Sequence, residues 1–272
     1  MLLGNLLKSV RKDYQKIPIR GISYDSRKVK EKDLFFAIKG SKTSGSKFVN
    51  EAILKGAAAI VSSEKKNYKN SNPPLILVKN VRLSLSEACS KFYKKKISNL
   101  IAVTGTNGKS SVADFFHQIF SLNKVSAASI GTLGVVSKKY NKKTNLTSMD
   151  PLLLHMHLQN LSVKKVNNII LEASSHGLHQ NRLNNLNIKA GIFTNLSHDH
   201  LDYHKNMKSY LNSKLYLFKN LLKKKSTIIT DKDNKEFKII KKIANSRKLK
   251  IITIGKKSSD IKILSNKYNQ DK

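Results

Sequence analysis

Residues 104–111 combine the side chains and glycines that bind the phosphates of a nucleotide. They read TGTNGKSS, follow four apolar residues at 100–103 and precede a helical pattern. Gly105 and Gly108 admit backbone conformations that turn amide groups inward around phosphate oxygens. Lys109 would bring an ammonium group to the β- and γ-phosphates, and Ser110 would offer its hydroxyl to Mg²⁺. The pattern predicts a phosphate-binding loop; the alternative is a glycine-rich turn without a ligand.

The segment after this loop favours the first reading. A helix predicted over Ser110–Leu122 starts where its positive N-terminal end would face the phosphates. Its apolar residues are predicted to form one stripe, which comprises Val112, Phe115, Phe116, Ile119 and Phe120. The loop departs from the commonest Walker pattern at Val103, where that pattern has glycine.

Two more polar clusters follow apolar runs. Glu172 ends the run NNIILE, and a carboxylate beside a phosphate loop is a natural Mg²⁺ ligand. The alternative for Glu172 is a structural or solvated role. The segment TNLSHDHLDYH at 194–204 holds His198, Asp199, His200, Asp202 and His204.

Three interpretations of the 194–204 segment stay open. Zinc is one, although the segment has no cysteine partner and lacks the spacing of a helical His-Glu-x-x-His site. Magnesium, bound by one histidine and one carboxylate and shared with a nucleotide, is another. The third is a polar loop whose histidines are solvated.

Lys214 lies at an unusual position in its predicted helix. It falls three residues after Leu211 and four before Phe218, on the apolar stripe. A buried lysine is rare unless it is paired or modified. The alternative is a side chain whose ammonium reaches solvent along its aliphatic stem.

Short strands that alternate with helices must position these clusters. The predicted strands are 74–78, 100–103, 168–171, 191–194, 227–230 and 251–254. The predicted helices are 86–96, 110–122, 152–161, 207–222 and 236–245. The alternation favours an α/β domain with a mainly parallel sheet. Ligands bind beyond the carboxyl ends of such strands, where Thr104–Ser111, Glu172–His176 and Asn195–His204 fall.

The chain divides into two predicted domains. The Lys-rich stretch KKKISN at 94–99 separates a first domain, residues 1–98, from a second, residues 99–272. Lys/Asn-rich segments at 65–72 and 138–145 are predicted to be solvated loops.

The composition is that of a globular protein with an excess of lysine. The 272 residues carry a formal net charge of +35, which raises the alternative of a nucleic-acid binder. Only six of the 52 basic residues are arginine, the preferred reader of phosphates and guanines, and the lysines are scattered. We therefore expect no specific nucleic-acid partner.

Other features point to the cytoplasm. The single cysteine, Cys89, excludes an intramolecular disulfide and fits a reducing compartment. No apolar run approaches the length of a membrane span, and the N-terminus is too quickly charged for a signal peptide. We expect a cytoplasmic monomer without membrane insertion.

Taken together, the motifs resemble those of the Mur ligases. The resemblance rests on YDSRKVKEKDLFFAIKG (24–40), GTNGKSS (105–111), EASSHGLHQNR (172–182), TNLSHDHLDYH (194–204) and YLNSKLYLF (210–218), which occur in the family's order and spacing. It covers nearly the whole chain. It implies a small N-terminal α/β uridine-binding domain, then a P-loop central domain with a mainly parallel sheet.

The resemblance also implies an activity. The family joins a carboxylate to an amine at the expense of ATP, with Mg²⁺, in peptidoglycan precursor synthesis. The motifs are most similar to members that add a diamino acid, 2,6-diaminopimelate or L-lysine, to UDP-N-acetylmuramoyl-L-alanyl-D-glutamate. The sequence does not discriminate between the two amino acids.

Site residues carry over position by position. The resemblance places ATP on Gly105, Thr106, Asn107, Gly108, Lys109, Ser110 and Ser111. It makes Lys109, Glu172, His200 and Lys214 catalytic, with Ser110, Glu172, His200 and a carbamylated Lys214 around Mg²⁺. It assigns the UDP-sugar peptide to Tyr24, Ser26, Ser41, Lys42, Thr43, Thr147, Ser148, Ser174, Gln180 and Arg182.

The chain departs from the family in three places. Leu146 and Met149 replace residues that are usually Thr or Pro, and His198 stands where Arg is frequent. The Asp-Asn-Pro-Arg type motif of the third, C-terminal ligase domain does not occur. We therefore expect a C-terminally truncated chain, with an incomplete central domain, that does not ligate on its own.

Three alternatives remain. One is another Mur ligase or a folylpolyglutamate synthase-type ligase. The second is a nucleic-acid-stimulated ATPase, suggested by the net charge. The third is a remnant that binds UDP-sugar or nucleotide without turnover.

Overall fold

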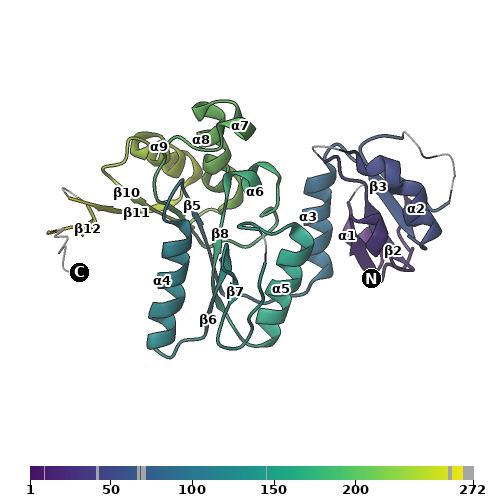
Figure 1. Cartoon of the computed structure of the whole chain (residues 1–272), viewed down its shortest axis with the longest axis horizontal. Coiled ribbons are helices and arrows are strands. Elements are labelled where there is room, and N and C mark those ends of the chain that lie inside the picture. The colour runs from purple at the N-terminus through teal and green to yellow at the C-terminus, as the bar shows by residue number, and fades with distance from the viewer. Residues whose placement is uncertain are drawn as a thin grey trace. The chain divides into compact units, whose positions relative to one another are not determined.

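The computed structural model describes residues 1–8, 10–40, 43–65, 68, 72–144, 146–256 and 259–265. These residues form two compact units (Figure 1). The first comprises Met1–Lys95 with Asp150–Gln159, and the second Lys96–Met149 with Asn160–Lys272. The first boundary between the units, at residues 95 and 96, lies near the predicted boundary at residue 98. Residues 150–159, which the prediction placed in the second domain, belong to the first unit.

The first unit is built on a parallel sheet in the order β1-β2-β3-β4. Its strands are β1 (Gly21–Ser23), β2 (Asp33–Phe36), β3 (Ala59–Ser62) and β4 (Leu75–Leu77), and its helices are α1 (Leu3–Leu6), α2 (Val49–Leu54) and α3 (Val81–Phe92). Side chains alternate along β2, so Leu34 and Phe36 enter one apolar cluster and Phe35 the other. Both faces are therefore buried, as parallel sheets require.

The second unit contains a larger sheet, in the order β12-β11-β10-β9-β5-β8-β6-β7 among the described residues. All of its pairings are parallel except that of β6 with β7. The strands are β5 (Asn99–Thr104), β6 (Ala127–Gly131), β7 (Gly134–Val136), β8 (Asn168–Glu172), β9 (Ala190–Phe193), β10 (Thr227–Asp231), β11 (Lys250–Gly255) and β12 (Ile261–Lys262). The predicted α/β class with a mainly parallel sheet is confirmed.

Helices cover both faces of this sheet. They include α4 (Lys109–Leu122), α8 (Met207–Tyr216) with the π-helical turn η4 (Leu217–Leu221), and α9 (Phe237–Arg247). The short helices α6 (Ser175–His179) and α7 (Leu201–His204) belong to the same unit, whereas α5 (Pro151–Val163) begins in the residues that join the first unit. Ile192 of β9 packs in the cluster that contains Val112 of α4, whereas Phe193 contacts Phe218 of η4. Because neighbouring strand residues point to opposite faces, α4 and η4 lie on opposite sides.

Two sequence predictions about helices need correction. The apolar stripe of α4 is not buried as one face, because Phe115 is 60% exposed and Ile119 57% exposed, while Val112 and Phe116 pack against Val103 and Ile170. The helix predicted over 86–96 begins earlier, at Val81, because the Asn80 side chain caps it by accepting a hydrogen bond from the Leu83 amide.

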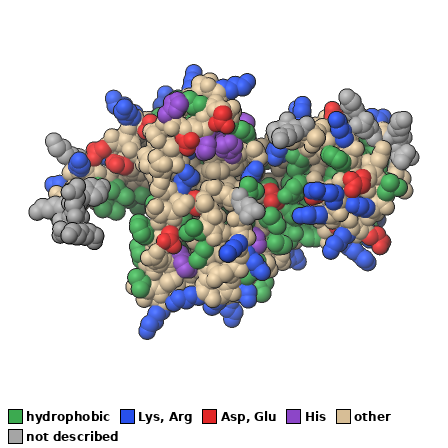
Figure 2. Space-filling model, viewed as in Figure 1, with side chains coloured by type: hydrophobic (Ala, Val, Ile, Leu, Met, Phe, Trp, Pro, Cys, Tyr) green, Lys and Arg blue, Asp and Glu red, His purple; other side chains and the backbone are tan. Residues whose placement is uncertain are grey.

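Charged side chains are spread over the surface. On the face shown in Figure 2, Lys and Arg side chains occur over both units, with Asp and Glu among them. Within the described residues, no helix is long and apolar enough to cross a membrane.

Candidate active site

The predicted phosphate loop joins the carboxyl end of β5 to α4. Gly108 has a φ of +81°, a left-handed conformation that glycine adopts without strain, and α4 starts at the next residue. The amides of Lys109, Ser110 and Ser111 open the helix and so have no acceptor within it. These are the amides that could bind a phosphate.

The two residues that follow β9 fix the rest of the loop through hydrogen bonds. The Thr106 and Asn107 amides donate to the backbone and side-chain oxygens of Asn195, at 2.9 and 3.0 Å. The Thr194 hydroxyl donates to the Asn107 carbonyl at 2.7 Å. In this structure the Thr106 and Asn107 amides therefore fix the loop to its neighbour. Their contact with the phosphates of ATP stays a prediction.

Lys109 folds back over the loop. Its Nζ donates to the carbonyl oxygens of Gly105 at 3.1 Å and Thr106 at 2.7 Å. Burial lowers the pKa of its ammonium, and the Glu172 and Asp199 charges oppose that shift. The ammonium thus lies at the loop, where a phosphate chain would lie against the α4 amides.

Glu172 sits at the carboxyl end of β8 and is only 3% exposed. Its Oε2 accepts from the Ser110 hydroxyl at 2.9 Å, and its Oε1 accepts from the Thr132 amide at 2.8 Å. A Cβ at Gly131 would collide with the Glu172 carboxylate, so only glycine leaves room for it. The predicted proximity of Ser110 and Glu172 is present.

This pair fits a magnesium ion. Mg²⁺ is bound in nucleotide sites through one or two carboxylates, a hydroxyl and phosphate oxygens. The Ser110 hydroxyl and the Glu172 carboxylate supply such donors beside the helix N-terminus. Glu172 is buried and already hydrogen-bonded to Ser110 and Thr132, so its carboxylate is held in one position, as a metal ligand requires.

Lys214 is a buried amine. It is 1% exposed, and its Nζ donates to the Gly105 carbonyl at 2.6 Å and lies 4.2 Å from the centre of the Tyr210 ring. Burial, reinforced by the charge of Lys109, lowers its pKa to about 7. The alternative in which this lysine reaches solvent is wrong, because α8 points it into the loop.

Tyr210 connects α8 to the phosphate loop. Its hydroxyl lies 3.2 Å from the Thr106 hydroxyl, whose oxygen also accepts from the Ser197 amide at 3.0 Å. One buried network therefore joins the loop, the segment after β9 and the helix that carries Lys214.

The histidine-rich segment forms an aromatic cluster. The ring centroids of His176 lie 4.9 Å from His200 and 5.4 Å from His204, and His200 is 6.2 Å from Tyr210. His204 is 4% exposed, and burial lowers its pKa to about 4. His200 is exposed, and its imidazole lies 3.4 Å from the Asp199 carboxylate.

This geometry bears on the three interpretations of the 194–204 segment. Across the described residues, no three His, Cys, Asp or Glu side chains form a group that could hold a metal. A zinc site made of protein side chains alone therefore finds no support there. The buried His204 is also no solvated loop residue, whereas the exposed His198 and His200 are.

The residues predicted to hold the sugar–peptide part lie around the end of β8. The Arg182 guanidinium donates to the Ser148 carbonyl at 2.6 Å and to the Gln180 side chain at 2.8 Å. Ser174 caps α6, and its amide donates to the Ser148 hydroxyl at 2.9 Å. Thr147 accepts from Thr132, a Glu172 partner, at 3.1 Å. These five residues therefore adjoin the Glu172 site.

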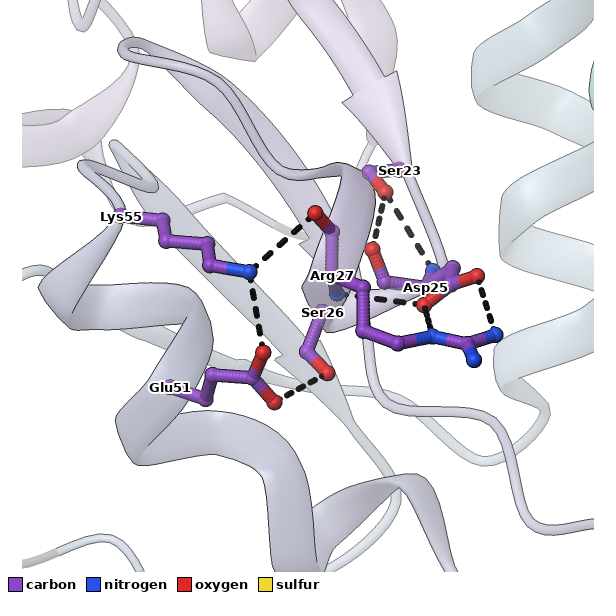
Figure 3. A network of polar contacts seen from close by, with 6 residues as sticks. All are labelled: Ser23, Asp25, Ser26, Arg27, Glu51 and Lys55. Atoms are coloured by element: carbon purple, nitrogen blue, oxygen red, sulfur yellow. Dashed lines mark hydrogen bonds and ion pairs between the residues drawn. The ribbon is translucent and has the colours of Figure 1, made fainter.

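The predicted uridine residues lie in the first unit. Tyr24, Ser26 and Thr43 line one cavity of about 450 Å³, together with Phe48 and Glu51. Figure 3 shows the polar network at its wall, in which Arg27 pairs with Asp25 and Ser26 contacts Glu51. The predicted residues Ser41 and Lys42 lie outside the described residues.

Sequence reasoning missed Thr132, Asn195 as a loop partner, Tyr210 and Glu51. Thr132 directly follows β6, a strand that was not predicted, so the rule that ligands gather at strand ends would have found it. Tyr210 is one helical turn before Lys214, and this spacing places both on one face. No signal in the sequence pairs Glu51 with Ser26.

A buried carboxylate and hydroxyl at a glycine loop, at the carboxyl edge of a parallel sheet, define a P-loop nucleotide-binding α/β protein. Comparison with known families makes this specific. Residues 103–272 match the Mur ligase middle domain, and residues 18–96 match the catalytic domain of the Mur ligase family. The chain belongs to the Mur ligase family.

Individual relatives agree. The UDP-N-acetylmuramoyl-L-alanyl-D-glutamate–2,6-diaminopimelate ligase of Rickettsia montanensis is 42% identical over 248 residues, which are 90% of this chain and 51% of that protein. The protein of the same name from Bradyrhizobium diazoefficiens is 39% identical, over 88% of this chain and 49% of that protein. The chain spans about half the length of these curated relatives.

Solved structures share the fold. A structure of a UDP-N-acetylmuramoyl-L-alanyl-D-glutamate–2,6-diaminopimelate ligase superposes with a TM-score of 0.83 at 28% identity, covering 96% of this chain and 54% of that one. MurF from Acinetobacter baumannii superposes with a TM-score of 0.63 at 18% identity, over 94% of this chain and 52% of that one. The second likeness concerns the fold alone.

Proposed function

We propose that this chain carries the UDP-sugar site and the Mg-ATP site of an ATP-dependent amide ligase. Its substrates would be UDP-N-acetylmuramoyl-L-alanyl-D-glutamate and a diamino acid, in cytoplasmic peptidoglycan precursor synthesis. The names of the relatives favour 2,6-diaminopimelate over lysine. The observation that carries the proposal is the Ser110–Glu172 pair at the phosphate loop, with the amine of Lys214 buried at the same loop.

The chemistry explains why such a site needs these groups. A carboxylate does not react with an amine at neutral pH, so its oxygen must first be made a leaving group. Transfer of the γ-phosphoryl group of ATP to the D-glutamyl carboxylate gives an acyl phosphate and ADP. The amine then attacks the acyl carbon, and the amide forms as phosphate leaves and the amine loses a proton.

The residues of this chain would serve the first step. Two anions meet, so cations must neutralise the charge that develops between them. Lys109 and the α4 amides would bind the phosphates, and Ser110 and Glu172 would hold Mg²⁺, which supplies further positive charge when bound. His200 remains a proposed participant, because its exposed ring lies beside Asp199 and adjoins Tyr210 through ring contact.

Lys214 is proposed to be carbamylated. Its pKa of about 7 leaves a large neutral fraction at physiological pH, and a neutral amine adds CO₂ to give a carbamate and one proton. The product would place a negative group beside the Gly105 carbonyl, where a second Mg²⁺ could offset it. Mass spectrometry after trapping of the carbamate by O-alkylation tests this step.

The proposed function is tested by titration of the protein with UDP-N-acetylmuramoyl-L-alanyl-D-glutamate in a calorimeter, with UDP-N-acetylglucosamine as the comparison. We expect the dipeptide compound to bind more tightly, and Arg182→Ala to weaken its binding by about tenfold or more. Equal binding of the two compounds by the wild-type protein would contradict the assigned substrate.

A further inference from the structure

The hydroxyl of Ser26 gives its proton to Glu51. Ser26 Oγ lies 2.6 Å from Glu51 Oε2, which is 25 residues away in the chain. An ionised carboxylate only accepts hydrogen bonds, so the serine must be the donor. The Ser26 hydrogen bond and then the Lys55 hydrogen bond lower the pKa of Glu51, which keeps it ionised at neutral pH. Ser26 therefore offers only lone pairs to a ligand.

Glu51 is held from its other side as well. Its Oε1 accepts from Lys55 Nζ at 3.0 Å, across one turn of α2, and the same ammonium donates to the Arg27 carbonyl at 3.1 Å. Figure 3 shows the hydrogen bonds that connect Lys55 to Glu51 and Glu51 to Ser26. Because both carboxylate oxygens are engaged, the direction of the Ser26 hydroxyl is fixed before any ligand arrives.

These groups line a cavity with aromatic walls. The cavity of about 450 Å³ is lined by Ser26 and Glu51 together with Tyr24 and Phe48, two residues that are 37% and 41% exposed. Exposed aromatic rings stack on the flat faces of nucleobases. A planar base between such walls would present its hydrogen-bonding edge to the polar side of the cavity.

We propose that Glu51, acting through Ser26, makes this cavity selective for uracil over cytosine. The proposal rests on the proposed function, in which the cavity holds the uridine end of the UDP-sugar. Uracil presents an imide N3–H, which the Ser26 lone pairs accept. Cytosine presents a lone pair at N3, and Ser26 could meet it only by withdrawing its proton from Glu51. Two acceptors that face each other without a proton, here Ser26 Oγ and cytosine N3, weaken binding by about tenfold or more.

The wild-type protein tests the donor requirement without any mutation. Calorimetry would compare UDP with CDP, with N3-methyl-UDP, which lacks the N–H, and with 5-methyl-UDP, which keeps it. We expect UDP and 5-methyl-UDP to bind alike, and CDP and N3-methyl-UDP to bind at least about tenfold more weakly. Binding of N3-methyl-UDP with the affinity of UDP would overturn the proposal.

Variants then test Glu51 as a positioning residue. In Glu51→Ala the freed hydroxyl can turn its proton to cytosine, so the ratio of UDP to CDP affinity should fall by about tenfold. Glu87→Ala is the matched control, because Glu87 forms the same type of ion pair with Lys91 one turn along α3 and does not line the cavity. Circular dichroism melts would check that both variants fold.

The outcomes separate the two proposals. If the wild-type protein does not bind UDP, the proposed function and this inference both fail. If UDP binds but CDP binds equally, or if Glu51→Ala keeps the full preference, the inference alone fails. If Glu51→Ala does not fold, the comparison of N3-methyl-UDP with 5-methyl-UDP decides the question.

Discussion

At the scale of single residues, the structure explains why a lysine occupies the apolar stripe of α8. Lys214 is removed from solvent by its neighbours, and it donates to one backbone carbonyl at the phosphate loop. A site that placed a permanent cation there would pay the full cost of burying it, whereas an amine that loses its proton near neutral pH does not. The lowered pKa is thus a consequence of the buried position, and the proposed carbamylation would require it.

The lowered pKa predicts how stability depends on pH. The unfolded chain keeps the lysine proton up to the ordinary value of 10.5, whereas folded Lys214 loses it near 7. Between these values the unfolded state binds more protons, so the contribution of Lys214 to stability rises with pH from about 7 to 10.5 and is least favourable below 7. Lys214→Met should flatten that rise.

The measurement is urea unfolding at several pH values in CO₂-free buffer, with Lys219→Met as the control. Lys219 lies in the following turn and is exposed, so its removal leaves the slope unchanged. An identical slope in wild type and Lys214→Met would show that the amine is not the titrating group.

Some of these residues could be predicted and others could not. Ser110 lies just beyond β5 and Glu172 ends β8, so the sequence pattern placed both at the carboxyl edge of a parallel sheet. Their contact also requires that β5 and β8 pair directly, which the structure shows and the pattern does not encode. Thr132 follows β6, a strand that reads AASIG and carries no alternating pattern. The Ser26–Glu51 pair depends on how α2 packs over η2 (Ser26–Lys28), which no local pattern encodes.

At the scale of elements, α8 is the connection between the histidine-rich segment and the phosphate loop. The sequence predicted one helix over 207–222, but α8 ends at Tyr216 and continues as the π-helical turn η4. The predicted strands at 100–103, 168–171, 227–230 and 251–254 are all present, because each is a short, mainly apolar run rich in β-branched residues that pairs in parallel with its neighbour. The predicted strand at 191–194 ends one residue earlier, since Thr194 turns to hold Asn107.

Tyr210→Phe tests the link between α8 and the loop. It removes the hydroxyl 3.2 Å from Thr106 and keeps the ring beneath Lys214. We expect a loss of about 1 kcal/mol in the free energy of unfolding, because one buried hydrogen bond disappears. Tyr216→Phe, another tyrosine of α8 whose hydroxyl accepts from Asn184, gives the comparison for a bond away from the loop. Urea unfolding measures both.

A stability of Tyr210→Phe equal to that of the wild-type protein would mean that the Thr106 contact contributes nothing. If this variant instead bound nucleotide more weakly and kept its stability, the hydroxyl would act by setting the conformation of the phosphate loop.

At the scale of the whole molecule, the net charge of +35 is the most unusual property of the chain. It does not by itself indicate a specific nucleic-acid partner. The basic side chains are mainly lysine, and on the face of Figure 2 they are interspersed with acidic ones. A surface of this kind attracts any polyanion through long-range electrostatics without reading its sequence.

We therefore predict weak binding to DNA that depends on salt and not on sequence. The affinity for oligonucleotides of different sequence should be equal and should fall by at least about tenfold between roughly 50 and 200 mM salt. Fluorescence anisotropy measures the binding, and a coupled assay measures ATP hydrolysis. Stimulation of hydrolysis by DNA or RNA at physiological salt would favour the nucleic-acid-stimulated ATPase instead.

The central claim is that the phosphate loop and Glu172 form one Mg-ATP site. Calorimetric titration with a non-hydrolysable ATP analogue, with and without Mg²⁺, tests it in the wild-type protein and in Glu172→Gln, which keeps the shape of the side chain and removes its charge. We predict that Mg²⁺ strengthens binding to the wild-type protein by at least about tenfold and has little effect in Glu172→Gln. Affinity independent of Mg²⁺ in the wild-type protein, or an equal effect of Mg²⁺ in both proteins, would contradict the account.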